Sequence, residues 1–221
     1  TSYFTQALIN AVSGGKAALF SSVDNCLDGH TYVESDLTTP ESMDAFRMMR
    51  EAADNGMEYL VMEVSSQAYK VDRVYGLTFD VAAFLNISPD HISPIEHPTF
   101  EDYLYCKRQI IANAKSLVLG ADSLHADLLR EDAAAAGIGA TTFALHDADN
   151  AGTSADVVAW PADPEHASFH IADGDQALGD YHLSIDGDFN YLNAAAAIAI
   201  AHAAGVSLDD AGALHAIESV R

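Results

Sequence analysis

Basic residues are scarce in this chain of 221 residues: ten lysines and arginines stand against 33 aspartates and glutamates, and the net charge is −23. A charge of this sign argues against nucleic acid and against an anionic membrane surface as binding partners. It also repels anionic small molecules at long range. A substrate that carries phosphate would therefore need a local cation, a metal ion or a helix N-terminus at its binding site.

Cysteine is equally scarce, with Cys26 and Cys106 alone. Two cysteines are too few for a disulfide framework, and these two lack the spacing of metal ligands. We therefore expect a reducing, cytoplasmic location. No run approaches the roughly 18 apolar residues of a membrane-spanning helix, and no signal peptide is evident. The composition, 49% hydrophobic, is that of a globular protein with a sizeable core.

Two short apolar runs, at residues 59–66 and 79–86, organise the chain. Neither alternates with polar residues, which is typical of strands buried on both faces of a parallel sheet. A loop at residues 87–98 follows, and then a helical segment begins at Phe100. Its apolar residues recur at the i, i+3, i+4, i+7 spacing of one helix face, and Lys107 lies on that apolar stripe.

Further strands and helices alternate along the first two thirds of the chain. Short strands are expected at residues 17–22, 116–120 and 141–145, and helices at residues 2–12 and 123–136. Another helix would be capped by Thr39, begun by Pro40 and ended by Gly56. Its inner side would carry Met43, Phe46, Met49, Arg50 and Ala53. This alternation predicts an α/β fold.

The last third differs, because its strands alternate polar and apolar residues and are separated by turns. Three such strands, with a hairpin turn at Asp173-Gly174, predict a small antiparallel sheet at residues 156–160, 168–172 and 181–185. An alanine-rich helix would run from Gly187 to Ala204, and a last helix would start at Ser207. We predict one domain over residues 1–221: a doubly wound, mostly parallel sheet flanked by helices, with a small antiparallel side sheet.

Two polar residues, Glu63 and His91, lie at or just past the carboxyl ends of the two central strands, where ligands bind in open α/β sheets. Glu63 and His91 are a plausible ligand pair for Mg²⁺ or Mn²⁺. An ammonium at Lys107 would repel such an ion, but a desolvated lysine can react with CO₂ as the neutral amine and become an anionic carbamate. Each residue alone has a simpler explanation: an ion pair, a histidine satisfied within its loop, or a snorkelling surface lysine.

The motifs around these residues carry a family resemblance. Met62-Glu-Val-Ser-Ser-Gln67, Leu85-Asn-Ile-Ser-Pro-Asp-His91 and Phe100-Glu-Asp-Tyr-x-x-x-Lys107 resemble the central, ATP-binding domain of the Mur ligases. Leu37-Thr-Thr-Pro-Glu-Ser42 and Arg73-Val-Tyr-Gly76 are similar to the MurE type, the UDP-N-acetylmuramyl-tripeptide synthetases. In that family a phosphate-binding loop leads directly into the first helix. We therefore expect the chain to be the central domain alone, beginning just after that loop.

The resemblance implies an ATP-dependent ligase of peptidoglycan synthesis. It would join a diamino acid, with L-lysine favoured, to UDP-N-acetylmuramoyl-L-alanyl-D-glutamate through an acyl phosphate. ATP and Mg²⁺ would be the cofactors, and the protein is expected to be a monomer. Two alternatives stay open: a ligase similar to folylpolyglutamate synthetase, and a nucleotide- or substrate-binding module without turnover.

The resemblance also implies roles for particular residues. Glu63, His91 and carbamylated Lys107 would be catalytic and would hold the metal. The muramyl substrate would contact Thr38, Thr39, Ser65 and Arg73, although capping alone would explain the two threonines. Asn190 and Asn193 would lie beside the adenine of ATP. Helix capping would explain Asn190 alone, but asparagine inside a helix, as at Asn193, is less natural.

Overall fold

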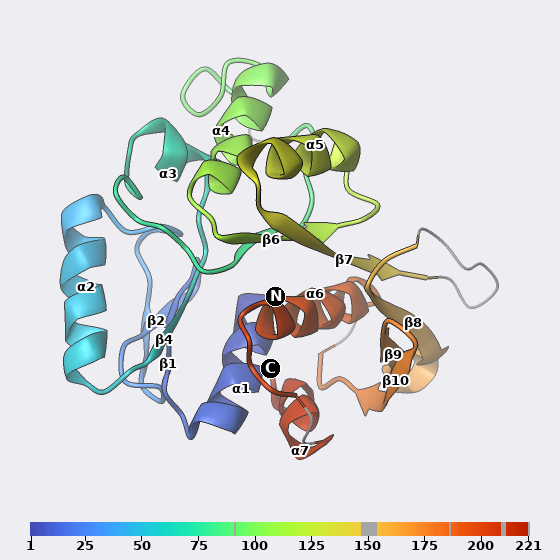
Figure 1. Cartoon of the computed structure of the whole chain (residues 1–221). Coiled ribbons are helices and arrows are strands. Elements are labelled where there is room, and N and C mark those ends of the chain that lie inside the picture. The colour runs from blue at the N-terminus through green and yellow to red at the C-terminus, as the bar shows by residue number, and fades with distance from the viewer. Residues whose placement is uncertain (91, 147–153, 186, 209–210, 221) are drawn as a thin grey trace.

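The computed structural model describes residues 1–90, 92–146, 154–185, 187–208 and 211–220, and it confirms the predicted α/β class (Figure 1). Within these ranges ten strands form two hydrogen-bonded sheets, one of six strands and one of four. None of the helices there has the length and hydropathy that crossing a membrane would require.

The larger sheet has the order β10-β9-β8-β7-β6-β5. Its strands are β5 (Ala82–Phe84), β6 (Ser116–Gly120), β7 (Gly139–Leu145), β8 (Val157–Asp163), β9 (Ser168–Asp173) and β10 (Gln176–His182). Strands β5 to β8 are parallel, and β8 to β10 are antiparallel. The predicted antiparallel strands therefore extend the edge of the parallel sheet.

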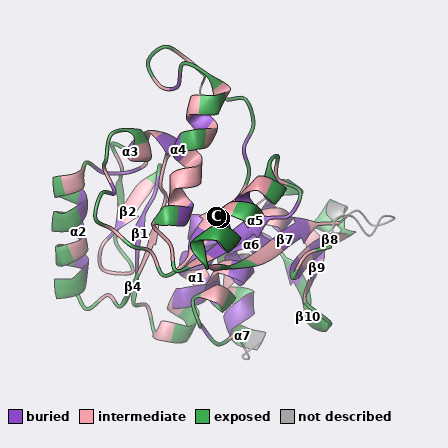
Figure 2. Cartoon of the chain, turned by 45° about the horizontal axis from the view of Figure 1, so that its top comes forward, coloured by how far each residue is buried: buried purple, intermediate pink, exposed green. Residues whose placement is uncertain are grey.

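Helices cover both faces of this sheet, as a doubly wound fold requires. Figure 1 shows α4 (Phe100–Ala112) and α5 (Ala126–Ala136) on one side of β6 and β7, and α1 (Ser2–Ser13) and α6 (Phe189–Ala203) on the other. Figure 2 shows that α6 is buried along most of its length. Its alanines let the helix lie close to the strands, because a methyl group needs little space between the two backbones.

The smaller sheet has the order β3-β2-β1-β4 and holds the first half of the predicted site. Its strands are β1 (Ala17–Phe20), β2 (Asp24–Cys26), β3 (Tyr32–Glu34) and β4 (Tyr59–Met62), with β1 and β4 parallel. Helix α2 (Ser42–Asp54) lies outside it, and the short α3 (Ser66–Lys70) follows β4. All four residues of β1 are buried, so this strand is the centre of the small sheet.

Several predicted boundaries were wrong. The run 59–66 is a strand only to Met62, because Ser65 caps α3. The run 79–86 narrows to β5, and Phe79 makes a single bridge to Ala114. The third antiparallel strand covers residues 176–182, not 181–185, because the turn at Gly174-Asp175 allows pairing from Gln176 onward. In place of one helix from Ser207, the structure has α7 (Ala211–Leu214) and the 3₁₀ helix η2 (His215–Ser219).

The prediction for α2 was wrong in two ways. The helix begins at Ser42, and Thr39 does not cap it. Its buried residues are Ala45, Met48 and Ala52, whereas Met43 is 82% exposed and Phe46 is 47% exposed. Each buried residue lies one position before a predicted one, so the buried face is turned by about 100° around the helix axis from the predicted stripe.

Candidate functional site

Glu63 follows the last residue of β4 and is held from two directions. Its Oε1 accepts a hydrogen bond from Ser2 Oγ at 2.5 Å, and its Oε2 accepts one from the backbone N–H of Ser22 at 3.0 Å. Its own N–H donates to Phe20 O, which continues the pairing of β4 with β1. The half-buried carboxylate is thereby fixed beside the first turn of α1.

The two predicted nucleotide residues lie at the same end of α1. Thr1 Oγ1 donates to Asn193 Oδ1 at 2.6 Å, and Asn193 Nδ2 donates to Asn190 Oδ1 at 3.2 Å. Capping does not explain Asn190, because Asp188 is the N-cap of α6 and Asn190 is a buried residue of its first turn. The adjacent residues Thr1 and Ser2 thus connect the asparagine pair and Glu63 to one helix N-terminus.

Thr39 has a role that the sequence did not reveal. Its side chain is wholly buried, and its Oγ1 donates to the carbonyl of Glu63 at 3.0 Å and accepts from the amide of Ser65 at 2.9 Å. Ser65 Oγ in turn accepts from the amide of Ala68 and caps α3. Thr39 therefore fixes the backbone on both sides of the β4–α3 turn. Substrate contact by Thr38, Thr39 and Ser65 stays a prediction.

Replacing Thr39 by valine should destabilise the protein by about 1–3 kcal/mol, the usual cost of leaving a buried polar group without its partner. Valine has nearly the same shape but cannot hydrogen-bond the two backbone groups. The denaturation midpoint measures the loss, and Thr39→Ser is the matched control, since it keeps the hydroxyl. Equal midpoints for Thr39→Val and the unmodified protein would contradict this assignment.

Arg73 connects the same turn to the segment before α2. One terminal nitrogen donates to the carbonyl of Thr39 at 3.3 Å, and the other pairs with Glu41 at 2.6 Å. The side chain is 13% exposed, and its Nε is buried without a hydrogen-bond partner among the described residues. Arg73 thus lies next to Thr39, as the predicted substrate segment requires, but its contact with substrate stays a prediction.

A hollow of about 550 Å³ lies between α2 and the β2–β3 hairpin, beside Leu37 and Pro40. Its charged lining is mostly acidic: Asp28, Glu34, Asp36, Glu41, Asp44 and Glu51 against Arg47. The amides of Thr31 and His30 donate to Asp28 and hold its pKa below its usual range, so it stays ionised. Such a lining repels a diphosphate. We therefore expect the phosphates of a substrate to bind elsewhere.

Lys107 lies on the inner side of α4, as the apolar stripe predicts. Its Nζ donates to the carbonyl of Asn86 at 3.0 Å and lies 5.5 Å from the ring centre of Phe84 and 5.3 Å from that of Tyr103. Desolvation by this burial lowers the pKa of Lys107, and the nearby Asp90 partly offsets the effect. The lysine is therefore placed at the carboxyl end of β5, next to the loop of Asp90. His91 itself lies outside the described residues.

Comparison with known proteins identifies the family of this chain. A family model described as the Mur ligase middle domain matches residues 1–201. The chain belongs to the Mur ligase family.

The chain is 97% identical over its whole length to a UDP-N-acetylmuramyl-tripeptide synthetase of Bifidobacterium longum (strain NCC 2705), of which it covers 43%. It is also 44% identical to a UDP-N-acetylmuramoyl-L-alanyl-D-glutamate--L-lysine ligase of Enterococcus faecalis (strain ATCC 700802 / V583). That match covers 94% of this chain and 41% of the ligase. The chain therefore spans less than half the length of the curated relatives it matches.

Solved structures share the fold at lower identity. The whole chain superposes on 44% of a UDP-N-acetylmuramoyl-L-alanyl-D-glutamate--2,6-diaminopimelate ligase with a TM-score of 0.77 and 20% identity. The chain also superposes on a complex of folylpolyglutamate synthetase with AMPPCP, with a TM-score of 0.63 and 16% identity. This match covers all of the present chain and 60% of the synthetase. The folylpolyglutamate alternative is thus a likeness of fold, whereas the sequence relatives are muramyl ligases.

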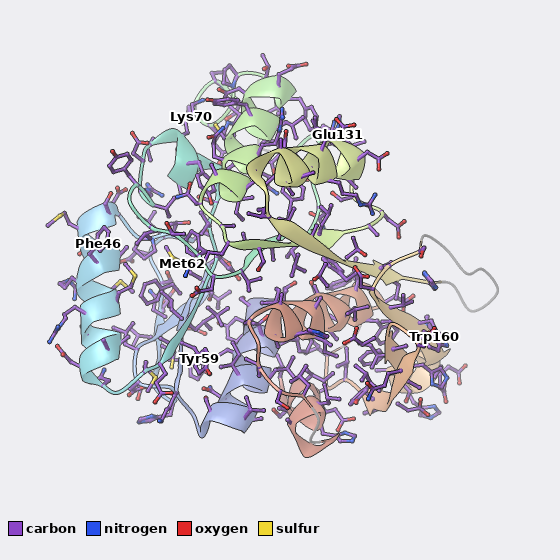
Figure 3. The ribbon with its side chains drawn as sticks, viewed as in Figure 1. Phe46, Tyr59, Met62, Lys70, Glu131 and Trp160 are labelled. Atoms are coloured by element: carbon purple, nitrogen blue, oxygen red, sulfur yellow. The ribbon has the colours of Figure 1, made fainter. Side chains whose placement is uncertain are left out.

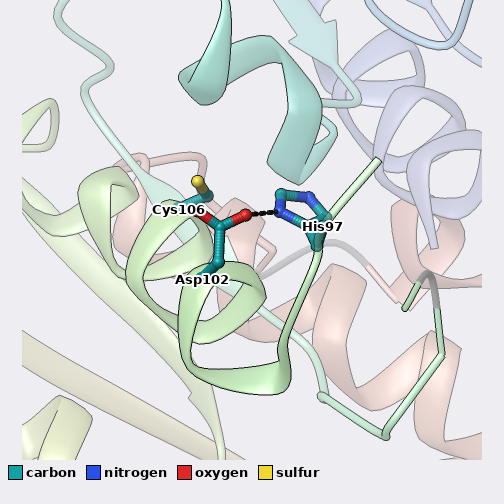
Figure 4. Close-up of side chains that lie close together, drawn as sticks. All are labelled: His97, Asp102 and Cys106. Atoms are coloured by element: carbon teal, nitrogen blue, oxygen red, sulfur yellow. Dashed lines mark hydrogen bonds and ion pairs between the residues drawn. The ribbon is translucent and has the colours of Figure 1, made fainter. Parts of the chain in front are cut away.

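Sequence reasoning missed a second cluster of polar side chains in this Mur ligase domain (Figure 4). Asp102 Oδ2 lies 2.7 Å from His97 Nδ1 and also accepts from Lys70 Nζ at 2.7 Å. His97 Nε2 lies 2.9 Å from Ser66 Oγ, and Cys106 is one turn further along α4. A histidine and an aspartate five residues apart, on either side of the Thr99 N-cap, are the only local signal for it.

His97, Asp102 and Cys106 have ligand atoms within 4.8 Å of one another, but their surroundings do not suit a metal ion. The ammonium of Lys70 already pairs with Asp102, and its positive charge would repel a metal ion bound to the same carboxylate. Burial raises the pKa of Cys106, and the Asp102 carboxylate raises it further, so the thiol stays protonated. A thiol binds metal as the thiolate. The group is therefore a hydrogen-bonded network.

Proposed function

We propose that this Mur ligase domain works in an ATP-dependent ligase that joins a diamino acid to UDP-N-acetylmuramoyl-L-alanyl-D-glutamate. The observation that carries the proposal is the near identity, over the whole chain, to a UDP-N-acetylmuramyl-tripeptide synthetase. We assign the activity to the longer protein that carries this segment, called here the full-length ligase. We place it in the cytoplasm as a monomer.

The reaction joins two anions, the side-chain carboxylate of the D-glutamyl residue and the γ-phosphate of ATP. A carboxylate oxygen attacks the γ-phosphorus, ADP leaves, and an acyl phosphate forms. The amino group of the diamino acid then attacks the acyl carbon, and phosphate leaves with the oxygen that bonded to it. Because like charges must meet in the first step, neutralising them is the main electrostatic requirement of the site.

The start of α1 supplies part of this neutralisation. Its first turn has no acidic residue, and no side chain among the described residues caps its N-terminal amides. These amides form the positive end of the helix dipole and suit a phosphate. Asn190 and Asn193 adjoin this end through Thr1, which supports a nucleotide position there. The position contrasts with the acidic hollow beside α2, which repels phosphate.

The donor set at Glu63 fits a magnesium ion. Each carboxylate oxygen takes one hydrogen bond, from Ser2 or Ser22, which leaves each oxygen with a further lone pair. Hard oxygen ligands of this kind are what Mg²⁺ prefers. We assign Glu63, His91 and a Lys107 carbamate to hold Mg²⁺, which when bound neutralises phosphate and carboxylate oxygens. Thr38, Thr39, Ser65 and Arg73 are assigned to the muramyl substrate.

We propose L-lysine, over meso-diaminopimelate, as the diamino acid that is added. Support comes from the Enterococcus faecalis relative, which is an L-lysine ligase by name. The diaminopimelate ligase structure is only 20% identical, so its likeness concerns the fold alone.

Product analysis of the full-length ligase tests the proposal. The enzyme is incubated with ATP, Mg²⁺, the UDP-dipeptide and either L-lysine or meso-diaminopimelate, and products are separated and weighed by mass spectrometry. We expect ADP and the lysine-containing UDP-tripeptide in equal amounts. Hydrolysis of ATP without any tripeptide from either amino acid would overturn the proposed function, whereas a diaminopimelate product alone would overturn only the choice of lysine.

A further inference from the structure

Four polar side chains connect the three segments that carry Glu63, His91 and Lys107. Ser66 and Lys70 belong to α3, His97 ends the 87–98 loop, and Asp102 lies in the first turn of α4. We call this set the α3–α4 clamp. Lys70 lies where α3 approaches α4 (Figure 3) and donates both to Asp102 and to the carbonyl of Glu96.

Each segment of the clamp leads directly to one predicted catalytic residue. Glu63 is three residues before Ser66, and the β4–α3 turn between them is fixed by Thr39. His91 belongs to the loop that His97 ends. Lys107 lies on α4, five residues after Asp102, so both are parts of one rigid helix. A shift of α3 against α4 would therefore change the spacing of Glu63 and Lys107.

His97 is the centre of the clamp and cannot turn freely. Its side chain is 1% exposed, and both ring nitrogens have partners, Asp102 and Ser66. The ring packs against Tyr103 with 5.1 Å between ring centres. Its carbonyl accepts from the amide of Ser93, and a backbone bridge joins it to Ile92. The imidazole thus ties the closed end of the loop to α3 and α4 together.

The hydrogen bonds run from serine to histidine to aspartate, the order found in hydrolytic triads. Burial decides against a nucleophile, because Ser66 is only 8% exposed and its hydroxyl is not open to a substrate. Lys70 on the same carboxylate adds a bond that links α3 to α4 directly, which serves to hold the elements together.

We propose that the α3–α4 clamp sets the spacing of Glu63 and Lys107, with His97 as a positioning residue. The idea rests on the proposed function, since it concerns the same site. Loss of the clamp should leave the fold and the substrate contacts intact while loosening the loop and α4. The chemical step should then suffer more than substrate binding.

Hydrogen exchange on the full-length ligase tests whether the clamp holds the 87–98 loop and α4 in place. In Ser66→Ala, amides in residues 87–98 and 100–112 should exchange about tenfold faster, the size expected when one buried hydrogen bond is lost. Ser66→Thr keeps the hydroxyl and should exchange like the unmodified enzyme. His166→Ala is a matched control, because it removes an exposed histidine–carboxylate pair, with Asp163, in another part of the chain.

A double-mutant cycle tests whether His97 is the partner that matters. His97→Asn keeps an amide donor near Asp102 but loses the bond to Ser66, so adding Ser66→Ala should accelerate exchange no further. Full additivity of the two substitutions would contradict the clamp. Unchanged exchange in the two segments, or faster exchange spread evenly over the whole chain, would do so as well.

Steady-state kinetics test whether the clamp matters for the chemical step. Ser66→Ala should lower kcat by about tenfold and raise the Mg²⁺ concentration for half-maximal rate, while the KM for the UDP-dipeptide stays within about twofold, since uniform binding is untouched. Unchanged kcat and Mg²⁺ dependence would overturn the positioning role. If the unmodified full-length ligase makes no tripeptide, the proposed function fails by itself, and hydrogen exchange still decides whether the clamp holds the segments.

Discussion

Replacing Lys107 by alanine in the full-length ligase should lower kcat by roughly 100- to 1,000-fold, the range seen when a group that stabilises developing charge is removed. Lys107 is half-buried beside the rings of Phe84 and Tyr103, and desolvation lowers its pKa. A larger fraction of the amine is therefore neutral at a given pH than in an exposed lysine. Neutral amine and CO₂ combine to a carbamate and release a proton, which would place an anion at the proposed metal site.

Chemical rescue separates the carbamate from a plain ammonium. Short carboxylic acids should restore part of the activity of Lys107→Ala, because an anion is what the variant lacks. Lys115→Ala is the matched control, since Lys115 is exposed, pairs with Asp80 and follows the same helix. Rescue by alkylamines, and none by carboxylates, would mean that the lysine acts as a cation and would refute the carbamate.

The acidity of the medium gives a second check on Lys107. Falling pH protonates the amine and removes the form that reacts with CO₂, so carbamate and activity should be lost together. Because the pKa is lowered, this loss begins at a lower pH than for an ordinary lysine. The carbamate carbon can be followed by NMR with ¹³C-bicarbonate, and its signal should be missing in Lys107→Arg.

Removing Glu63 or His91 should lower kcat by about 100-fold each, comparable with the loss of one electrostatic stabiliser. Glu63→Gln keeps the size of the side chain and its acceptor for Ser2 but removes the charge that a magnesium ion needs. His91→Ala removes the second predicted ligand. Rates are measured over a range of Mg²⁺ concentrations, since weaker metal binding should be partly overcome by more metal.

Matched controls exist for both substitutions. Glu58→Gln changes an exposed glutamate at the other end of β4, paired with Lys16, and His30→Ala changes an exposed histidine paired with Asp28. Both should turn over normally. Near-normal turnover of Glu63→Gln and His91→Ala at saturating Mg²⁺ would show that the metal is held by other residues.

Sequence patterns predicted the parts of the fold that depend on local periodicity. Strands β1, β4, β6 and β7 and the alanine-rich α6 all lie within or close to the expected ranges. For β1 and β6 the reason is burial on both faces, which leaves a continuous apolar run. Strands β2 and β3 were not predicted. Each has only three residues, so the pairing of β2 with β1 and of β3 with β2 forms them more than their own propensity does.

The site was predictable only in part, for a similar reason. Glu63 and Lys107 could be located because each interrupts an apolar pattern near a strand end or on a helix stripe. Thr39 was misread as a cap, since its real partners, Glu63 and Ser65, are more than 20 residues away in sequence. The α3–α4 clamp was missed because Ser66 and His97 are 31 residues apart. Polar contacts over such separations leave no periodic signal.

The formation of an acyl phosphate is the central claim, and oxygen transfer measures it directly. The UDP-dipeptide is labelled with ¹⁸O in both oxygens of the D-glutamyl side-chain carboxylate, and the full-length ligase turns it over with ATP, Mg²⁺ and L-lysine. The released phosphate should contain one ¹⁸O per tripeptide formed, because the oxygen that attacked the γ-phosphorus leaves with it. Tripeptide formed together with unlabelled phosphate would contradict the account.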